Sequence, residues 1–310
     1  MKKNIAIAVL AAATLGACQN APEATTEATN ESSDMKEMKS FKKGYQLYTI
    51  RENMVDSASI EAAFAETHAM GYEQVETFGY MSGNFFGYTP EGLNDAIHAS
   101  DMSSPSGHYL PMELAMGEVG PISTENIPAM LDAAEALGQK WIIIPWMNEA
   151  WRTAEGYEHL VVYLSQLGEA ARERGLIAAW HNHDFEFAPL DPNDPESITA
   201  YEYLLKSLEG TNVVFEMDLH WVAFAGENPV DWFENYPGRF PLWHVKDFAA
   251  DTLTQVPVGQ GVIDWENIFN HAELSGMEHY FIEQDVCSAD RALDCLKESL
   301  NWAKEQKFIP

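Results

Sequence analysis

The chain has 310 residues and a formal net charge of −30, from 48 acidic and 18 basic side chains. This length is sufficient for one large domain or two ordinary ones. Hydrophobic residues make up 46% of the chain and can supply a sizeable core. Binding to nucleic acid requires a basic surface that replaces the counterions of the phosphates, so the acidic balance argues against a nucleic-acid partner.

The N-terminus has the pattern of an export signal. Two lysines precede an apolar run that is too short to span a membrane comfortably, which predicts a signal peptide over residues 1–17. The run ends in "LGAC", which resembles the lipobox of bacterial lipoproteins, and a chance cysteine after a secretory signal is the alternative. The resemblance implies cleavage before Cys18 and a lipid on its sulfur. We therefore expect an exported bacterial lipoprotein at the periplasmic face or outer membrane, attached to the membrane through this lipid only.

The next segment, residues 18–40, is rich in Ala, Thr, Glu and Ser and contains almost nothing to bury. It predicts a disordered, lipidated tether that leads to a folded domain over residues 41–310. Two further cysteines lie near the C-terminus of that domain. Cys287 and Cys295 can form a disulfide in an oxidising compartment, and two free buried thiols are the alternative.

From residue 44 onward, short apolar runs alternate with longer stretches of helical pattern. Helical stretches such as 126–138 and 156–175 end in glycine, as helices commonly do. Eight strand–helix units in about 265 residues fit a single-domain α/β fold, the (β/α)8 TIM barrel. A doubly wound open sheet is the alternative, and it is weakened because no G-x-G-x-x-G turn follows the first run. The expected strands are 44–50, 74–79, 105–110, 141–146, 176–183, 213–219, 241–247 and 280–285.

Ionisable side chains occur at the ends of six of the eight expected strands. Functional groups of TIM barrels lie at these carboxyl ends, and a buried charge there is costly unless it is paired or coordinated. Asp218, His244 and Glu283 follow three consecutive strands and combine two carboxylates with an imidazole. That mixture suits one divalent ion: Mn²⁺, Mg²⁺, Co²⁺ or Zn²⁺. The other residues of the set are Glu76, His108, His181, His183 and Lys246.

A fourth ligand is expected from the stretch "HNHDFEF" at residues 181–187. Side chains of a strand alternate at a period of two, so His181 and His183 can both face the mouth of the barrel. Glu186 lies beyond the strand, where a loop can fold it over a substrate as a base. Taken alone, the stretch can also be a polar loop after a buried strand.

These strand ends resemble the xylose isomerase-like TIM-barrel superfamily, and within it the sugar phosphate isomerase/epimerase group. The matching stretches run from residue 44 toward the C-terminus: "YQLYTIR", "HNHDFEF", "FEMDLHWVAFAGENP", "HVKD", "VGQGVIDW" and "FIEQD". The resemblance implies one divalent cation held by Glu, Asp, His and Glu from strands five to eight. Asp218, His244 and Glu283 match the last three positions. The first position is His181 here, with Glu186 as the alternative ligand.

The resemblance also implies proton abstraction beside a carbonyl, with the cation acting as a Lewis acid that stabilises an enediolate. Glu186 or His183 would move the proton, and Lys246 would stabilise negative charge or protonate an oxygen. The alternative for Lys246 is a structural ion pair with Asp247 or Glu283. The expected activity is that of a metal-dependent sugar or keto-sugar isomerase/epimerase. A keto-sugar lyase or hydratase and a non-catalytic sugar-binding lipoprotein are the alternatives.

The substrate is expected to be an unphosphorylated sugar or keto-sugar, because sugar phosphates belong to the cytoplasm and this exported, acidic chain has no P-loop. Glu76 and His108 are expected to contact the substrate. Trp146 and Trp221 can provide flat apolar walls for a sugar ring, and core packing is the alternative for both. The glycines of "VGQGVIDW" predict a turn and not an anion-binding loop.

Overall fold

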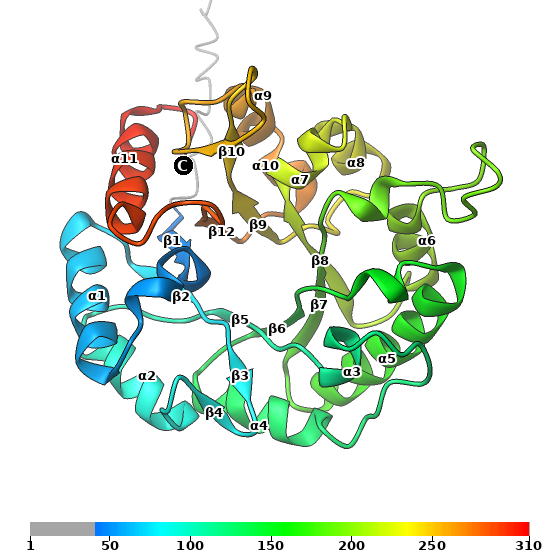
Figure 1. Cartoon of the computed structure of the whole chain (residues 1–310), viewed down its shortest axis with the longest axis horizontal. Helices are drawn as coiled ribbons and strands as arrows, with labels where there is room; N and C mark the ends of the chain where they lie inside the picture. Colours follow the sequence, from blue (N-terminus) through cyan, green and yellow to red (C-terminus); the bar gives the residue numbers. More distant parts are fainter. Residues whose placement is uncertain (1–40, 310) are drawn as a thin grey trace, which may run out of the picture. The chain divides into compact units, whose positions relative to one another are not determined.

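The computed structural model describes residues 41–309, which form a barrel of eight parallel strands with helices around it (Figure 1). The sheet order is β2-β1-β12-β9-β8-β7-β6-β5, and parallel bridges from Gln74 to Ser103 and from Thr77 to Gly107 join its two edges. The (β/α)8 barrel predicted from the sequence is confirmed. The strands are β1 (Lys43–Gln46), β2 (Gln74–Glu76), β5 (Ser106–His108), β6 (Trp141–Ile144), β7 (Ile177–His181), β8 (Val213–Asp218), β9 (Leu242–Val245) and β12 (His279–Ile282).

The predicted signal peptide, Cys18 and the predicted tether at residues 18–40 lie outside the described residues and stay predictions. Within residues 41–309, no helix combines the length and the apolar composition that a membrane crossing requires.

Each predicted strand is present, but several end earlier than expected because their last residues turn into loops at the C-terminal face. The run 44–50 leaves the sheet after Gln46, where the side chain of Gln46 caps the 3-10 helix η1 (Leu47–Asn53). Similarly, β7 ends at His181, so that His183 lies in the loop beyond the sheet. The polar residues of the strand ends are thereby directed toward one face of the barrel.

The outer helices begin and end at residues suited to those positions. Asp56 precedes α1 and forms a capping box with Ser59, whose amide donates to the Asp56 carboxylate at 2.8 Å. Gly71 ends α1 with φ +109°, a conformation that glycine adopts without strain. The helices are α1 (Ser57–Met70), α2 (Pro90–His98), α3 (Met112–Ala115), α4 (Ile127–Ala136), η2 (Glu149–Trp151), α5 (Ala154–Glu173), η3 (Phe185–Phe187), α6 (Ala200–Ser207), α7 (Leu219–Phe224), α8 (Pro229–Asn235), α9 (Trp265–Asn270), α10 (Ala272–Ser275) and α11 (Ala292–Glu305).

Apolar side chains fill the middle of the barrel, and the polar groups of the pocket lie at its carboxyl end. In β8 alternate residues share the inward face, so Val214 packs against the interior cluster while Glu216 and Asp218 follow it toward the strand end. Gly44 makes room for this cluster, since a Cβ atom at Gly44 would lie 2.5 Å from the ring of Phe281. The interior cluster consists of Trp141, Ile143, Ala179, Leu242 and Phe281.

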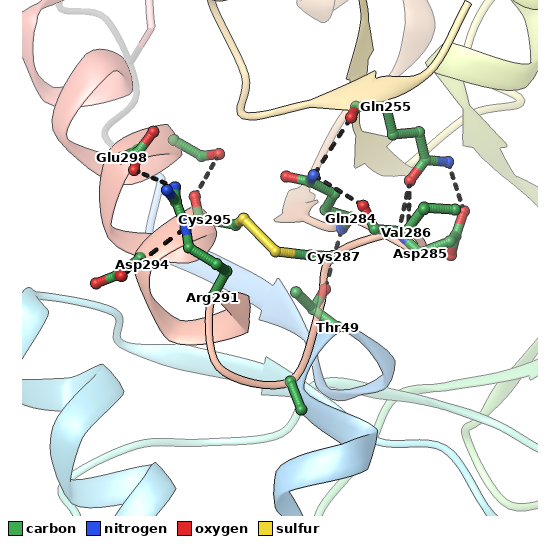
Figure 2. Close-up of a disulfide and its surroundings, with 12 residues drawn as sticks. Thr49, Gln255, Gln284, Asp285, Val286, Cys287, Arg291, Asp294, Cys295 and Glu298 are labelled. Atoms are coloured by element: carbon green, nitrogen blue, oxygen red, sulfur yellow. Dashed lines mark hydrogen bonds and ion pairs between the residues drawn. A yellow bond between two sulfur atoms is a disulfide. The ribbon is translucent and has the colours of Figure 1, made fainter.

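Two hairpins and one disulfide shape the loops that follow the strands. One hairpin follows β2 and the other follows β9. After β12, a disulfide between Cys287 and Cys295 ties the loop to α11 (Figure 2), which decides between the two alternatives for these cysteines. The hairpins are formed by β3 (Tyr80–Met81) with β4 (Asn84–Phe85), and by β10 (Asp247–Phe248) with β11 (Gln255–Val256).

Candidate active site

A pocket of about 570 Å³ opens among the loops at the carboxyl ends of the strands. Its polar residues come mainly from the end of β7 and from the loops after β7, β9 and β12. Its apolar residues come mainly from the loops after β1, β2, β5 and β6. The lining residues are Tyr48, Phe78, Gly79, Tyr80, Met81, His108, Leu110, Met112, Pro145, Trp146, His181, His183, Trp221, Lys246, Glu283 and Asp285.

Four buried side chains converge beside this pocket, and we call them the ligand cluster: His181, Asp218, His244 and Glu283. They offer ligand atoms that all lie within 4.8 Å of one another. His181 Nε2 is 3.4 Å from Asp218 Oδ2, and His244 Nδ1 is 2.7 Å from Glu283 Oε2. Within residues 41–309, none of these four atoms meets the geometry of a hydrogen bond, although Lys246 forms ion pairs with both carboxylates. Buried imidazole nitrogens and carboxylate oxygens that converge on one point are the ligand types that a divalent cation binds.

Hydrogen bonds behind two ligands fix which atom faces this point. His181 Nδ1 lies 3.1 Å from the carbonyl oxygen of Pro145, so Nδ1 carries the hydrogen and Nε2 keeps its lone pair. Asp218 caps α7, because its Oδ1 accepts hydrogen bonds from the amides of His220 (3.0 Å) and Trp221 (3.1 Å). Its Oδ2 therefore remains for the ligand cluster.

His244 joins a second buried group, the lower cluster, through its other ring nitrogen. His244 Nε2 lies 2.7 Å from Glu76 Oε1 and 3.2 Å from Glu216 Oε2. His108 Nε2 lies 2.8 Å from Glu216 Oε2 and 3.2 Å from Glu76 Oε1. Each imidazole is hydrogen-bonded through Nε2 to a carboxylate of the lower cluster. These bonds hold the His244 ring with Nδ1 toward Glu283 of the ligand cluster.

Charge pairing sets the protonation of the lower cluster. Burial alone would lower the pKa of His108, but Glu76 and Glu216 outweigh it and raise this pKa to about 9. At His244, the carboxylates of Glu216, Glu283 and Glu76 likewise outweigh burial and raise the pKa well above its ordinary value. The two histidines in turn hold the pKa of Glu76 well below its ordinary value, against the effect of burial.

Lys246 is a buried cation beside the ligand cluster. Its Nζ lies 2.8 Å from Asp218 Oδ2, 2.6 Å from Glu283 Oε2 and 2.9 Å from Asp285 Oδ2. Burial would lower the pKa of Lys246, but these carboxylates raise it well above its ordinary value. The ion pair with Glu283 that the sequence offered as an alternative is present. Lys246 also lines the pocket, so its positive charge lies beside the space that a ligand would occupy.

Gln255 holds the third of these carboxylates in place. Its Oε1 accepts hydrogen bonds from the amides of Asp285 (2.6 Å) and Val286 (3.2 Å), and its Nε2 donates to Asp285 Oδ2 at 2.8 Å (Figure 2). The next residue is Cys287, whose disulfide to Cys295 anchors the far side of the same loop. The loop that carries Asp285 is therefore held at both of its ends.

Lys246 forms its ion pairs with Asp218, Glu283 and Asp285, and not with Asp247, the other alternative from the sequence. Asp247 instead accepts hydrogen bonds from the amides of Gly259 (3.0 Å) and Gly261 (3.2 Å) and from the indole of Trp265 (3.0 Å). The turn predicted from "VGQGVIDW" is confirmed. The amides of this turn bind a carboxylate of the chain itself, that of Asp247.

His183 lines the pocket with its ring stacked near Phe185 and Trp221, at centroid distances of 5.4 and 5.6 Å. Its Nδ1 is buried and has no hydrogen-bond partner in the described part of the chain. Burial, together with the neighbouring His181 and Lys246, lowers the pKa of His183 well below its ordinary value. The ring is therefore neutral and has a lone pair available to accept a proton.

Glu186 does not lie where the sequence suggested. It is fully buried and is not one of the residues that line the pocket. Its Oε2 accepts a hydrogen bond from the amide of His183 (2.9 Å), and its Oε1 accepts one from the indole of Trp180 (3.2 Å). Burial raises the pKa of Glu186 to about 8. The single turn η3 directs this carboxylate inward, so in the structure it does not lie over the pocket.

Three of the four residues expected to contact the substrate line the pocket: His108, Trp146 and Trp221. The fourth, Glu76, is fully buried in the lower cluster and also accepts a hydrogen bond from Gln46 Nε2 at 2.7 Å. Neighbouring donors already surround the oxygens of Glu76, and its expected contact with a substrate stays a prediction. The roles of the other predicted site residues stay predictions.

Sequence reasoning missed Glu216 and Asp285. Glu216 precedes Asp218 by two residues, and the strand period of two could have placed both on the inward face of β8. Asp285 follows Glu283 by two residues, and the same spacing could have drawn attention to it. Gln255, which positions Asp285, comes from a separate hairpin, and no sequence pattern marks it.

Fold and site together define a class of protein: a TIM barrel with cation-binding types of side chain at the carboxyl ends of β7, β8, β9 and β12. The chain belongs to the xylose isomerase-like TIM barrel family, whose sequence profile matches residues 64–306. The superfamily that its strand ends resemble is thereby confirmed.

Individual relatives are distant. Inosose dehydratase from Bacillus anthracis (strain CDC 684 / NRRL 3495) is 24% identical over 163 residues, which cover 46% of this chain and 52% of the relative. The chain thus matches about half the length of that curated relative. A sugar phosphate isomerase/epimerase from Parabacteroides distasonis ATCC 8503 superposes with a TM-score of 0.75 at 21% identity, covering 89% of this chain and 97% of that one. The IOLI protein with a bound zinc atom superposes with a TM-score of 0.63 at 14% identity, covering 87% and 98%. At these sequence identities, the similarity to solved structures establishes the fold alone.

Proposed function

We propose that this chain is a divalent-metal-dependent enzyme that removes a proton from the carbon beside a carbonyl group of an unphosphorylated sugar or keto-sugar. The ligand cluster is the observation that carries the proposal. Four buried ligand atoms, from two imidazoles and two carboxylates, lie within 4.8 Å of one another beside the pocket. This donor set fits one Mn²⁺, Mg²⁺, Co²⁺ or Zn²⁺ ion.

A bound cation would polarise the carbonyl and stabilise the negative charge that develops on its oxygen. The side chains of the pocket perform the proton transfers. His183 presents a neutral imidazole that can take the proton from carbon. Lys246 presents an ammonium group that can protonate an oxygen of the substrate. Glu186 takes no part in these steps and instead holds the loop of His183 through its hydrogen bond to the amide.

Two reaction types are compatible with this start, and the pair of side chains favours one of them. An epimerase returns the proton to the opposite face of the same carbon, so it needs two groups of similar proton affinity. Here the two groups that line the pocket are an imidazole, which can accept a proton, and an ammonium group, which can donate one, so they are not a matched pair of bases. That pair suits elimination of water or an alcohol from a keto-sugar, and in reverse it suits hydration.

The elimination is balanced without any further reactant. His183 accepts the proton as the carbon–hydrogen bond breaks, a carbon–carbon double bond forms, and the bond to the departing oxygen breaks. Lys246 protonates that oxygen, so that water or an alcohol leaves. The curated relatives named inosose dehydratase support the same reaction class by their name. Isomerisation or epimerisation, the activity expected from the sequence, is the second candidate, supported by the fold shared with a sugar phosphate isomerase/epimerase.

The charges around the pocket support an unphosphorylated substrate. In the described part of the chain, Lys246 is the only lysine or arginine that lines the pocket. Three carboxylates within 2.9 Å already pair with it. A phosphate group would therefore find no free lysine or arginine beside the pocket, and it would approach Asp285 and Glu283.

Export as a lipoprotein remains part of the proposal. A disulfide persists in an oxidising compartment, so the bond between Cys287 and Cys295 supports a location outside the cytoplasm. In the native bacterium, the full chain should fractionate with membranes, and Cys18→Ala should release it. Membrane association that persists in the Cys18→Ala variant would contradict lipid attachment.

The test of the activity combines metal analysis with turnover. The purified chain, stripped of metal and reloaded with each of the four ions, is incubated in D₂O with 3-keto-glucosides, glucose and fructose. We expect metal-dependent exchange of the hydrogen beside the carbonyl, with formation of an unsaturated ketone if the reaction is elimination. Binding of sugar without exchange or product would favour the sugar-binding lipoprotein. Exchange that is independent of added metal would refute the proposed mechanism.

A further inference from the structure

The pocket has two chemically different halves, which follow the two halves of the barrel. The polar half comes mainly from β7, β8, β9 and β12, and it carries the ligand cluster with His183 and Lys246. The apolar half comes from the loops after β1, β2, β5 and β6, which are neighbours around the barrel. Its main side chains are Tyr48, Phe78, Tyr80, Met81, Met112 and Trp146.

The apolar half offers few partners to a polar ligand. No carboxylate, amide, lysine or arginine side chain belongs to it in the described part of the chain. The hydroxyl of Tyr80 already donates to the carbonyl oxygen of Ala129 at 3.1 Å. Tyr80 therefore offers a ligand the apolar surface of its ring. A surface of this kind leaves the hydroxyl groups of a second sugar ring without hydrogen bonds, which is costly when they lose water.

The aromatic part of this half is built as a fixed surface. Phe78 packs edge-on between Tyr48 and Phe86, with ring centroids 5.1 and 5.0 Å apart. Gly79 permits this packing, because a Cβ atom there would lie 2.6 Å from the ring of Phe86. Phe86 itself has φ +50°, a conformation that is uncommon for a non-glycine residue. The positive φ belongs to the tight turn from Phe85 to Tyr88, whose backbone groups exchange two hydrogen bonds, at 2.9 and 2.8 Å.

Two methionines extend the surface at its rim and are unusually exposed. Met81 is 66% exposed and Met112 is 59% exposed, although both line the pocket. Exposed apolar groups that adjoin an aromatic surface indicate a contact with something apolar. Methionine suits that contact because its flexible thioether adapts to flat ligands and packs well against aromatic rings.

We infer that the apolar half is a subsite for a flat, apolar group attached to the sugar, such as an aromatic aglycone. This inference rests on the proposed function for the sugar itself, whose oxygens face the polar half. A pocket of about 570 Å³ is in the size range of drug-sized ligands, so it has space for a ring system beside a single sugar. The substrate class is therefore an aryl glycoside or its keto derivative, and not a free monosaccharide or a disaccharide.

Binding of unreactive ligands tests this inference without any need for turnover. The full chain, loaded with Mn²⁺, is titrated calorimetrically with phenyl β-glucoside, methyl β-glucoside and cellobiose. Phenyl β-glucoside should bind at least about tenfold more tightly than either of the others. Equal affinities, tighter binding of cellobiose, or no binding of any of the three would overturn the inference.

Variants of the methionines locate the subsite. Changing both Met81→Ser and Met112→Ser should weaken binding of the phenyl glucoside by about fivefold and leave the methyl glucoside unchanged. Met116→Ser is the matched control, because Met116 is 58% exposed in the same segment and does not line the pocket. An equal loss in the control, or none in the double variant, would reject this location. If keto-sugars are not converted but the phenyl preference holds, the proposed function fails and the subsite stands.

Discussion

Replacing Asp218 with asparagine tests the ligand cluster without dismantling the helix behind it. Asp218 Oδ1 caps α7 through the amides of His220 and Trp221, and the amide oxygen of asparagine can keep both hydrogen bonds. The oxygen Oδ2, which lies 3.4 Å from His181 Nε2 and 2.8 Å from Lys246 Nζ, becomes an NH₂ group. The variant therefore loses one charged ligand atom and little else.

The expected loss of metal affinity is large compared with the change in stability. Even partners that only orient a ligand are worth about 10–100-fold in affinity, so loss of a ligand should weaken Mn²⁺ binding by about 100-fold or more. The metal-free protein should change by only about 1–2 kcal/mol, because Lys246 keeps Glu283 and Asp285 as partners and a buried charge is removed. Asp218→Ala should lose the same affinity and, without the cap, about 1 kcal/mol more stability.

Two measurements separate these terms. Equilibrium dialysis gives Mn²⁺ content and Kd, and urea unfolding with and without Mn²⁺ gives the free energy of unfolding. For wild-type protein, Mn²⁺ at about 1,000 times its Kd should raise that free energy by about 4 kcal/mol. Asp218→Asn should lose most of this increment. A variant that binds Mn²⁺ with unchanged Kd, and keeps the whole increment, would refute the ligand cluster as a metal site.

Three further predictions concern other side chains of the domain. Glu186 has a folded-state pKa of about 8, above its ordinary value near 4.5, so folding takes up a proton between these pH values and the free energy of unfolding should fall as pH rises through that window. Glu186→Gln should remove about 3–5 kcal/mol of this decline. Parallel pH profiles of the free energy of unfolding for variant and wild-type protein would contradict this prediction. Lys246→Met and His183→Gln should each lower turnover by at least about 100-fold while Mn²⁺ stays bound, and loss of Mn²⁺ in dialysis would mean that their roles are misassigned. The disulfide closes a segment with a sequence separation of 8, so Cys287→Ser should lower stability by about 2–3 kcal/mol, and dithiothreitol should lower the melting temperature of wild-type protein but not of the variant.

The barrel and the ligand cluster were predictable because topology does most of the placement. Parallel strands of a closed barrel bring all their carboxyl ends to one face, so a polar residue at the end of an apolar run has few other places to go. His181, at the end of β7, lies next to Asp218 for this reason, although the two are 37 positions apart in the sequence. The strand limits were less predictable, since local caps such as Gln46 end a strand before its apolar run ends.

Glu186 was not predictable because its position depends on one short turn beyond a strand. Spacing limits how far such a side chain can reach, but it does not determine the direction in which the turn points. In the structure, η3 brings the carboxylate to the amide of His183 and the indole of Trp180, two donors that need buried acceptors. Satisfying those donors decided the outcome, and neither of them is recognisable as a partner of Glu186 from spacing alone.

Glu76 shows how a residue that does not line the pocket can still act on the site. Its carboxylate accepts a hydrogen bond from His244 Nε2, which leaves Nδ1 of the same ring to face Glu283 and the proposed cation. Glu216 and His108 complete the lower cluster, so the charge of each carboxylate is opposed by an imidazole instead of competing for Lys246. Glu76 therefore bears on the ligand cluster through the orientation of His244, whose ring is the physical link between the two clusters.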